Sequence, residues 1–240
     1  MSARNLLTAV LIAGLAWMQT GCDGGRCVRG NRDVITEYRT AEAFSGTISE
    51  GSWDVFIHHD SLYYVIIEAE SNILPYIVTE TADDDMVLRT RRGRCINNRE
   101  PIRIHVYTPD LRRVALMGSG DIDAEQLAGV HTELRISGSG DIQAGVLAEN
   151  LKAVISGSGD LHLMGEVDVS EMEISGSGDI RAYDLVQRNC FATISGSGDM
   201  YLNVTDLLDV RITGSGDVYY TGNPQVRSYI PGSGSIHHVW

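Results

Sequence analysis

Aromatic residues are scarce in this chain. Only 3 Phe and 3 Trp stand beside 26 Gly among 240 residues, although 43% of the residues are hydrophobic. The apolar side chains are therefore mostly aliphatic, which argues against one large core built around aromatic rings. Aliphatic side chains suit a stack of thin repeated layers, in which each layer contacts only its neighbours.

Positive charge is also scarce. The chain has 19 Lys and Arg against 32 Asp and Glu, which gives a formal net charge of −13. Such a chain repels a phosphate backbone, and no stripe of basic residues offsets the repulsion. The composition therefore excludes nucleic acid as a partner.

The apolar run at the N-terminus, Leu6 to Trp17, is too short for a membrane-spanning helix and is typical of a secretory signal peptide. Small residues then precede Cys22, as in the lipobox of bacterial lipoproteins, although Gln19 stands where that motif has an aliphatic residue. We expect residues 1–21 to be a signal peptide, Cys22 to carry a lipid that binds the membrane, and residues 22–35 to be a lipid-anchored tether. The alternative is an ordinary cleaved secretory signal.

Cysteine is sparse as well. Once Cys22 is lipidated, Cys27, Cys95 and Cys190 remain in a compartment that permits disulfides. A bridge between Cys27 and Cys95 is one option, but spacing alone does not fix the pairing. Cys190, next to Phe191, is expected to be a small buried apolar residue instead of a reactive thiol.

The dominant feature of the chain is a repeat. Gly-Ser-Gly begins at seven positions, with 18 to 20 residues between successive copies: Gly118, Gly138, Gly157, Gly176, Gly196, Gly214 and Gly232. An aspartate follows each of the first six copies: Asp121, Asp141, Asp160, Asp179, Asp199 and Asp217. The residue after each aspartate is aliphatic or Met, so the whole unit recurs and not the turn alone.

A unit of about 19 residues has room for three short strands and tight corners, but not for a crossover helix of ordinary length. When coils stack at the ~4.8 Å spacing of strands, like residues lie over like and form aliphatic columns. In two successive units these residues are Ile122, Ala124 and Leu127, and Ile142, Ala144 and Leu147.

We therefore predict an all-β fold, a right-handed parallel β-helix with coils of about 19 residues, whose regular repeats occupy residues 111–240. Leucine-rich repeats fit less well because they need a leucine-dense consensus. Calcium-binding nonapeptide repeats fit less well because their period is half as long.

Residues 36–110 contain no clean copy of the repeat, yet apolar residues alternate there as in β-strands. The segment from Ile48 to Val55 resembles a degenerate Gly-Ser-Gly-Asp corner that is expanded by one residue. We predict that this region opens the same solenoid as irregular coils, widened by insertions at Asn72–Tyr76 and Ala82–Asp85.

These motifs resemble the head GIN domain family of auto-transporter adhesins, which occurs in envelope proteins of Bacteroidetes. The resemblance runs from about Glu37 to Ile236 and includes Gly51-Ser52-Trp53-Asp54-Val55, Ile73-Leu74-Pro75-Tyr76-Ile77, the Gly-Ser-Gly-Asp ladder and Gly222-Asn223-Pro224. It implies a right-handed β-helix and an adhesin-like role. The lipid expected at Cys22 from the N-terminal sequence would then be the means of attachment.

The six aspartates are the main candidate site, because carboxylates stacked about 5 Å apart repel by roughly 1 kcal/mol per pair in water. Each carboxylate could accept backbone N–H bonds in its own corner. Alternatively, the column could bind Ca²⁺, the one cofactor that the pattern suggests. Polysaccharide cleavage is disfavoured, because the carboxylates repeat evenly instead of forming one unequal pair. We expect no catalytic residue and no other metal site, since the neighbours in His58-His59 and His237-His238 point to opposite faces of a strand.

The sequence favours a non-catalytic binding or structural role in the cell envelope, as an outer membrane lipoprotein that is periplasmic or surface-exposed. Its ligand would be a glycan or a protein, and the candidate residues of a binding face are Tyr183, Tyr201, Tyr219 and Tyr220, with core packing as their alternative. The alternative function is a cation-dependent protein that binds or cleaves glycans. The end of the chain, Ile236 to Trp240, lacks a charged cap, which favours self-association there.

Overall fold

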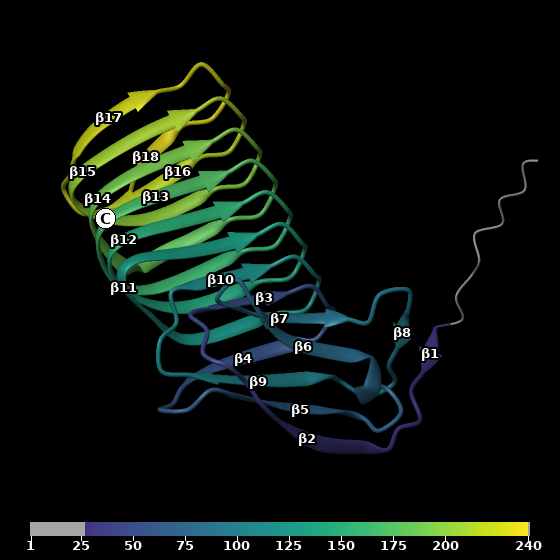
Figure 1. The fold of residues 1–240 in the computed structure, drawn as a ribbon. Helices are drawn as coiled ribbons and strands as arrows, with labels where there is room; N and C mark the ends of the chain where they lie inside the picture. The colour runs from purple at the N-terminus through teal and green to yellow at the C-terminus, as the bar shows by residue number, and fades with distance from the viewer. Residues whose placement is uncertain (1–26, 240) are drawn as a thin grey trace, which may run out of the picture.

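The computed structural model describes residues 27–239, and within them the chain is mostly β-strand (Figure 1). The only helical element of this range is one 3-10 turn, η1 (Leu74–Tyr76). No helix among these residues is long and apolar enough to cross a membrane. The all-β prediction is confirmed, whereas the expected signal peptide, residues 1–21, and the expected lipid site, Cys22, lie outside the described residues.

Five long strands form the regular solenoid, and each is almost a whole coil: β11 (Ile122–Ile136), β12 (Ile142–Ile155), β13 (Leu161–Ile174), β14 (Ile180–Ile194) and β15 (Met200–Ile212). Each pairs in parallel with the next. Three shorter strands complete the stack: β16 (Val218–Thr221), β17 (Gln225–Tyr229) and β18 (Ile236–His238). Because β16 and β17 pair in parallel with β15, and β18 with β16, the parallel β-helix is confirmed.

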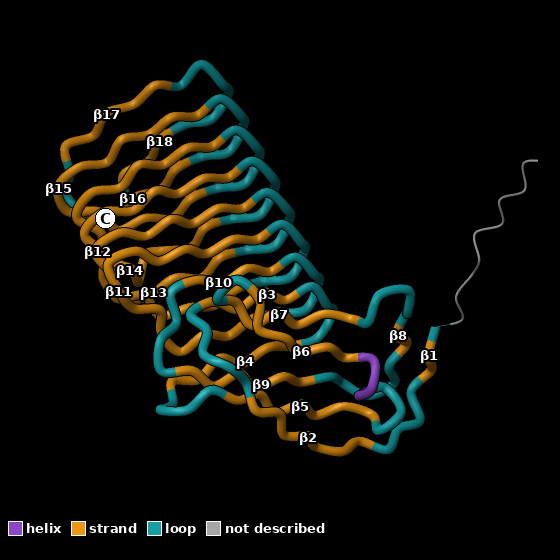
Figure 2. The backbone as a smooth tube through the Cα atoms, in the orientation of Figure 1, coloured by secondary structure: helices purple, strands orange, loops and turns teal. Residues whose placement is uncertain are grey.

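Each regular coil has a single break in its strand. The Gly-Ser-Gly corner separates successive long strands, and the corners stack into one column of loops (Figure 2). The three short strands expected in each coil are instead one bent strand. At the bends the ladder shifts its register without ending, as between Ala124 and Leu127.

Aliphatic side chains stack into buried columns inside the coils, as predicted. One column consists of isoleucines that lie opposite each other in successive strands: Ile136, Ile155, Ile174, Ile194 and Ile212. The prediction that Leu147 belongs to another buried column is wrong. Its side chain is 54% exposed, and Val146 is buried opposite Leu127 instead. The cause is the register shift after Ala124, which leaves the second coil one residue shorter at this bend.

Close approach between coils explains the corner glycines. A Cβ added to Gly157 would lie 1.9 Å from the carbonyl oxygen of Gly138 in the preceding coil. Positive φ is not the reason, because the positive-φ glycines within residues 27–239 all lie outside the corners. Any other residue at these positions would force neighbouring coils apart.

The region before the repeats contains eight strands of the same sheet: β2 (Val34–Thr40), β3 (Gly46–Ser49), β4 (Asp54–His59), β5 (Tyr64–Glu70), β6 (Ile77–Ala82), β7 (Asp85–Thr90), β9 (Arg103–Thr108) and β10 (Arg113–Leu116). Strands β10, β3 and β7 continue the parallel ladder from β11, and so do β4 and β9. In contrast, β2 with β5, β5 with β9, and β6 with β7 are antiparallel pairs.

The parallel strands of this region continue the solenoid, whereas the antiparallel strands β2, β5 and β6 depart from the irregular coils expected over residues 36–110. Neighbouring strands that are joined by a short loop must be antiparallel, because parallel neighbours need a long crossover connection. The expected insertion at Ala82–Asp85 is such a link, a two-residue turn between β6 and β7 in which Asp83 and Asp84 have φ of 51° and 69°. The other expected insertion contains η1 and leads from β5 to β6.

The degenerate corner predicted at residues 48–55 lies against the first regular corner, where the Ser119 amide donates to the Gly51 carbonyl at 3.1 Å. It is not expanded by a residue, because Ser49 takes the place of the isoleucine in the ladder. Trp53 occupies the position of the last corner glycine, is buried, and donates its indole N–H to Ser49 Oγ at 3.1 Å. The tryptophan fits because β7 and β9, which lie beyond β3 and β4, are not joined by a tight corner.

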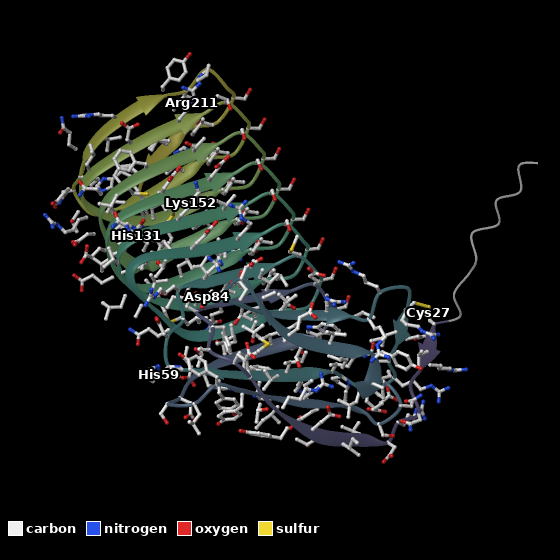
Figure 3. The ribbon with its side chains drawn as sticks, in the orientation of Figure 1. Cys27, His59, Asp84, His131, Lys152 and Arg211 are labelled. Carbon is white, nitrogen blue, oxygen red and sulfur yellow. A yellow bond between two sulfur atoms is a disulfide. The ribbon has the colours of Figure 1, made fainter. Side chains whose placement is uncertain are left out.

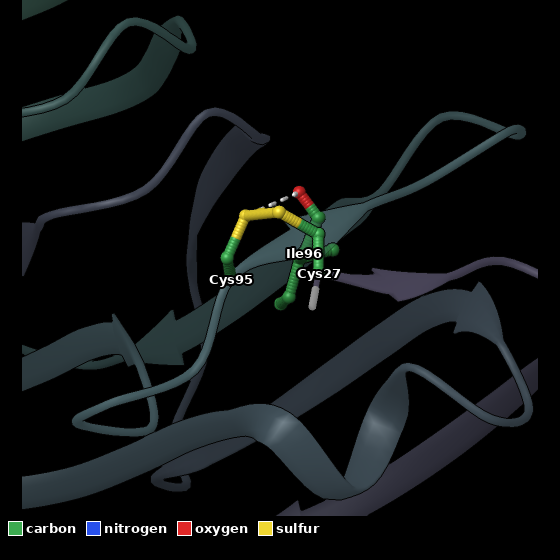
Figure 4. Close-up of a disulfide and its surroundings, with 3 residues drawn as sticks. All are labelled: Cys27, Cys95 and Ile96. Carbon is green, nitrogen blue, oxygen red and sulfur yellow. Dashed lines mark hydrogen bonds between the residues drawn. A yellow bond between two sulfur atoms is a disulfide. The ribbon is translucent and has the colours of Figure 1, made fainter. Parts of the chain in front are cut away.

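A disulfide fixes the start of the described chain. Cys27 and Cys95 are bonded, with their Cα atoms 4.4 Å apart (Figure 4). Next to them, β1 (Val28–Arg29) pairs in parallel with β8 (Ile96–Asn97). Residues 27–35 therefore belong to the folded region, in contrast to the tether expected over residues 22–35.

The remaining cysteine of the described residues, Cys190, is fully buried as predicted. Burial raises the pKa of its thiol to about 12, so the thiol stays protonated and unreactive at neutral pH.

Glu70, at the end of β5, is a buried carboxylate next to the disulfide-linked segments. It accepts backbone N–H bonds from Arg32, Arg99 and Glu100. Burial raises the pKa of Glu70, but these bonds together lower it by more, so its pKa lies below the usual value. Because Arg32 follows β1 and Arg99 follows β8, the carboxylate holds both segments against β5.

Candidate functional site

The six predicted aspartates form one column beside the Gly-Ser-Gly corners. The carboxylate of each accepts the backbone N–H of the residue one coil further on, over N···O distances of 3.0, 2.8, 2.8, 2.9, 2.7 and 2.7 Å from Asp121 to Asp217. The expectation that each carboxylate caps its own corner is therefore wrong. Because the bond crosses from coil to coil, it offsets the repulsion between stacked charges.

The same kind of hydrogen bond ends the column. The last acceptor is the Asp217 carboxylate, which binds the amide of Ser235 at 2.7 Å. Ser235 thus supplies the amide of the last bond without a carboxylate of its own.

The second carboxylate oxygens are only partly engaged. Arg181 donates to Asp160 at 2.7 Å and to Asp179 at 3.1 Å, and so offsets part of the negative charge in the middle of the column. The Tyr219 hydroxyl donates to Asp217 at 3.4 Å. Within residues 27–239 no group of three or more His, Cys, Asp or Glu side chains is arranged to hold a metal ion. The hydrogen bonds to the backbone amides explain why the carboxylates are stacked. Calcium binding by the column stays a hypothesis.

Three of the four predicted tyrosines lie together on the outer face of the last coils. We call the row Tyr183, Tyr201, Tyr219 and His237 the aromatic strip. Tyr201 stacks on Tyr219 with ring centroids 5.2 Å apart, Tyr219 stacks on His237 at 4.9 Å, and Tyr183 meets Tyr201 edge-on at 5.6 Å. Tyr220, in contrast, packs partly against the core and stacks on His238.

The stacking decides what the aromatic strip presents to a ligand. Neighbouring rings cover both faces of Tyr219, so only its edge is open to a ligand, and its hydroxyl lies against the carboxylate column at Asp217. Burial, together with the nearby aspartates, raises the pKa of Tyr201 and of Tyr219. Both hydroxyls are therefore protonated at neutral pH; that of Tyr219 donates to Asp217 and can accept a further hydrogen bond, whereas that of Tyr201 can donate one.

A second set of rings crosses the outer face of the N-terminal strands. Successive centroids are 5.1, 4.2, 4.8, 5.5 and 5.0 Å apart along the row Tyr38, Tyr64, Tyr107, His58, His105 and Phe56. Burial, with help from Asp60, raises the pKa of Tyr64 to about 12. Burial and the neighbouring His58 lower the pKa of His105.

Sequence reasoning missed this second cluster. It considered His58 only with its neighbour His59, whereas the actual partner is His105, on a different strand. The available signal was that Phe56 and His58 alternate with buried residues, as His105 and Tyr107 also do. Without the pairing of β4 with β9, that signal does not bring the two histidines together.

Comparison with known proteins gives one family match and several solved structures of the same fold. Residues 43–224 match the model of a family described as "Putative auto-transporter adhesin, head GIN domain". Comparison with functionally curated proteins gives no match.

Solved structures share the fold. A Bacteroides fragilis protein described as a "putative adhesin" is 21% identical, with a TM-score of 0.84 over 88% of this chain and 100% of its own. A Parabacteroides distasonis protein named as lipid binding is 23% identical, with a TM-score of 0.75 over 90% of this chain and 100% of its own. The sequence match covers most of the chain and the fold agrees with it, so this protein belongs to the head GIN domain family of auto-transporter adhesins.

Proposed function

We propose that the protein is an outer membrane lipoprotein, with residues 1–21 as its signal peptide and Cys22 as its lipidated residue. The disulfide between Cys27 and Cys95 supports export, because such bonds persist in oxidising compartments. Cys27 lies five positions after Cys22, which is a reach of at most ~17 Å. The lipid would therefore hold the N-terminal strands close to the membrane, while the last coils lie at the opposite end of the solenoid (Figure 1).

Cell fractionation of a Cys22→Ser variant tests the anchor. The unaltered protein is expected in the membrane fraction and the variant in the soluble fraction, whereas Cys190→Ala should fractionate like the unaltered protein. If Cys22→Ser stays with the membrane, the lipid anchor is wrong.

We propose further that the protein acts as a non-catalytic, adhesin-like binder and that the aromatic strip is its contact surface. The observation that carries this proposal is the alignment of tyrosine edges and hydroxyls beside Asp199 and Asp217, repeated at the spacing of the coils. Such a surface offers regularly spaced donors and acceptors next to apolar ring edges. It suits an extended ligand with many hydroxyl or amide groups, which is a glycan or a protein segment.

A glycan array and immobilised envelope components test the binding surface. The soluble Cys22→Ser protein should bind, and Tyr201→Ala/Tyr219→Ala should weaken binding by about tenfold or more, as expected for loss of an interface anchor. Phe191→Ala is the matched control, because Phe191 is an exposed aromatic residue outside the aromatic strip. Equal binding by the double variant would overturn the assignment of the strip.

A further inference from the structure

Six exposed arginines lie around the disulfide at the start of the described chain. They account for six of the 19 Lys and Arg in a chain whose formal net charge is −13. Figure 3 shows nitrogen-bearing side chains around Cys27, at the end of the molecule where β1 and β8 lie. We call the following set the arginine patch: Arg29, Arg32, Arg91, Arg92, Arg94 and Arg99.

The fold assembles the patch from two segments that are far apart in sequence. The bond between Cys27 and Cys95 and the parallel pairing of β1 with β8 place residues 27–32 beside residues 91–99. The Glu70 carboxylate accepts the backbone N–H groups of both Arg32 and Arg99, so it joins the two segments without engaging their guanidinium groups. Six like charges are thereby held in one small area.

The guanidinium groups of the patch are available to a ligand. Within residues 27–239 none of the six forms an ion pair, whereas Arg135 and Arg188 in the regular coils do. Residues 27–33 and 91–100 contain only two acidic residues, Asp33 and Glu100. The Arg94 guanidinium lies 5.7 Å from the centroid of the Tyr76 ring, a contact that orients it without neutralising its charge. The patch therefore presents net positive charge on an otherwise acidic molecule.

The surroundings of the patch favour a membrane surface as its ligand. Guanidinium groups bind phosphate oxygens in pairs, and lipid headgroups supply phosphates side by side. Val34 and Ile35, which follow Arg32 at the start of β2, are 48% and 43% exposed, and such apolar side chains suit the boundary between headgroups and acyl chains. A long polyanion such as nucleic acid would instead extend onto the acidic coils, which repel it.

We propose that the arginine patch binds the phosphate groups of anionic lipids in the membrane to which Cys22 is anchored. The inference rests on the lipid anchor proposed above, since the short reach from Cys22 to Cys27 brings the patch to the bilayer surface. There the attraction acts within about one Debye length, ~8 Å at physiological ionic strength. The same surface repels the acidic coils, so the solenoid points away from the membrane and the aromatic strip faces outward.

Sedimentation of the soluble Cys22→Ser protein with vesicles tests the patch without the lipid anchor. Vesicles of equal parts phosphatidylglycerol and phosphatidylcholine should bind the protein, and vesicles of phosphatidylcholine alone should not. Binding should weaken as NaCl is raised, because exposed charges are screened. In the same background, Arg91→Gln/Arg92→Gln/Arg94→Gln should lower the affinity on the order of 100-fold, at about fivefold for each arginine.

The matched control removes the same number of charges from exposed positions of the coils: Arg135→Gln/Arg188→Gln/Arg227→Gln. This control should bind the anionic vesicles as well as the Cys22→Ser protein does. Both triple variants should keep their circular dichroism spectrum and Tm, because all the replaced side chains are exposed.

Equal binding to the two kinds of vesicle, or equal affinities of the two triple variants, would overturn the arginine patch. Release by sodium phosphate, where NaCl of the same ionic strength releases nothing, would assign the patch to free phosphate and overturn the membrane contact. Absence of vesicle binding would overturn the patch even where cell fractionation confirms the anchor. The patch alone binds weakly and is screened by salt, so Cys22→Ser should still leave cell membranes in a salt wash.

Discussion

The backbone amide of Asp141 donates a hydrogen bond of 3.0 Å to the carboxylate of Asp121, which belongs to the preceding coil. The same bond recurs along the column as far as Ser235. The most conspicuous acidic feature of the chain is therefore a coil-to-coil fastening. Each aspartate is needed by the coil that follows it.

Replacing one aspartate should loosen the stack. Asp160→Ala removes the acceptor of the Asp179 amide and one partner of Arg181, so it should lower the free energy of unfolding by about 2 kcal/mol. Asp160→Asn keeps one oxygen acceptor and should lose less stability. Asp123→Ala, at an exposed position on β11, is the control, and urea unfolding gives all three values. Equal free energies of unfolding for Asp160→Ala and the control would contradict the role of the aspartates in holding the coils together.

Adding one methyl group at a corner should be more damaging. Gly157→Ala would place a Cβ 1.9 Å from a backbone oxygen, and the backbone cannot move without opening the ladder. We expect a loss of about 3 kcal/mol or more. Ser158→Ala, at an exposed position in the same corner, should change the unfolding free energy by less than about 0.5 kcal/mol. Thermal melting of both variants checks the difference, and a corner that tolerates alanine would refute the close-approach explanation.

Reduction of the disulfide should destabilise the N-terminal strands. Cys27 and Cys95 are 68 residues apart in sequence, and a bridge over a loop of this size contributes about 2–4 kcal/mol. Dithiothreitol should lower the Tm of the unaltered protein to that of Cys27→Ala/Cys95→Ala. The double variant itself should not respond to the reductant, since Cys190 is buried and unpaired. A reductant effect of the same size in the double variant would show that another cause is at work.

Glu70 should make stability depend on acid pH. The pKa of Glu70 is lower in the folded chain than the ordinary 4.5, so its contribution is complete above that value and is lost as the pH falls through the folded pKa. Glu70→Gln should be less stable than the unaltered protein at pH 7, and the two should converge as the medium becomes acidic. Tm measurements between pH 7 and acid check this, and a constant difference across the range would contradict it.

The regular coils were predictable from sequence because each residue has a copy of itself as its neighbour. Ile155, for example, lies between Ile136 and Ile174, so the repeat period alone gives the pairing. The positions of the bends within each coil were harder to predict from sequence. Leu147 and Val146 exchange roles because a single residue is missing from one coil.

The N-terminal strands could not be predicted in the same way. The antiparallel pairing of β5 follows from short links and from contacts with β2, which no repeat encodes. The bonds of Glu70 to Arg32 and Arg99 join segments that are far apart in sequence.

The candidate site was predictable in its position but not in its bonding. Sequence spacing placed Asp121 to Asp217 in one column, while the choice between an amide of the same corner and one of the next coil depends on the backbone path. His58 and His105, 47 residues apart, required the order of the strands.

Calcium titration of the metal-free protein tests most directly whether the aspartate column serves to fasten the coils. We predict no heat of binding and an unchanged Tm in excess CaCl₂, because one oxygen of each carboxylate binds an amide and Arg181 offsets part of the negative charge in the middle of the column. A site filled at 100 times its Kd would add about 2.7 kcal/mol to the free energy of unfolding. A stoichiometric heat with a matching rise in Tm, both lost in Asp121→Asn/Asp141→Asn, would contradict this role and identify the column as a cation site.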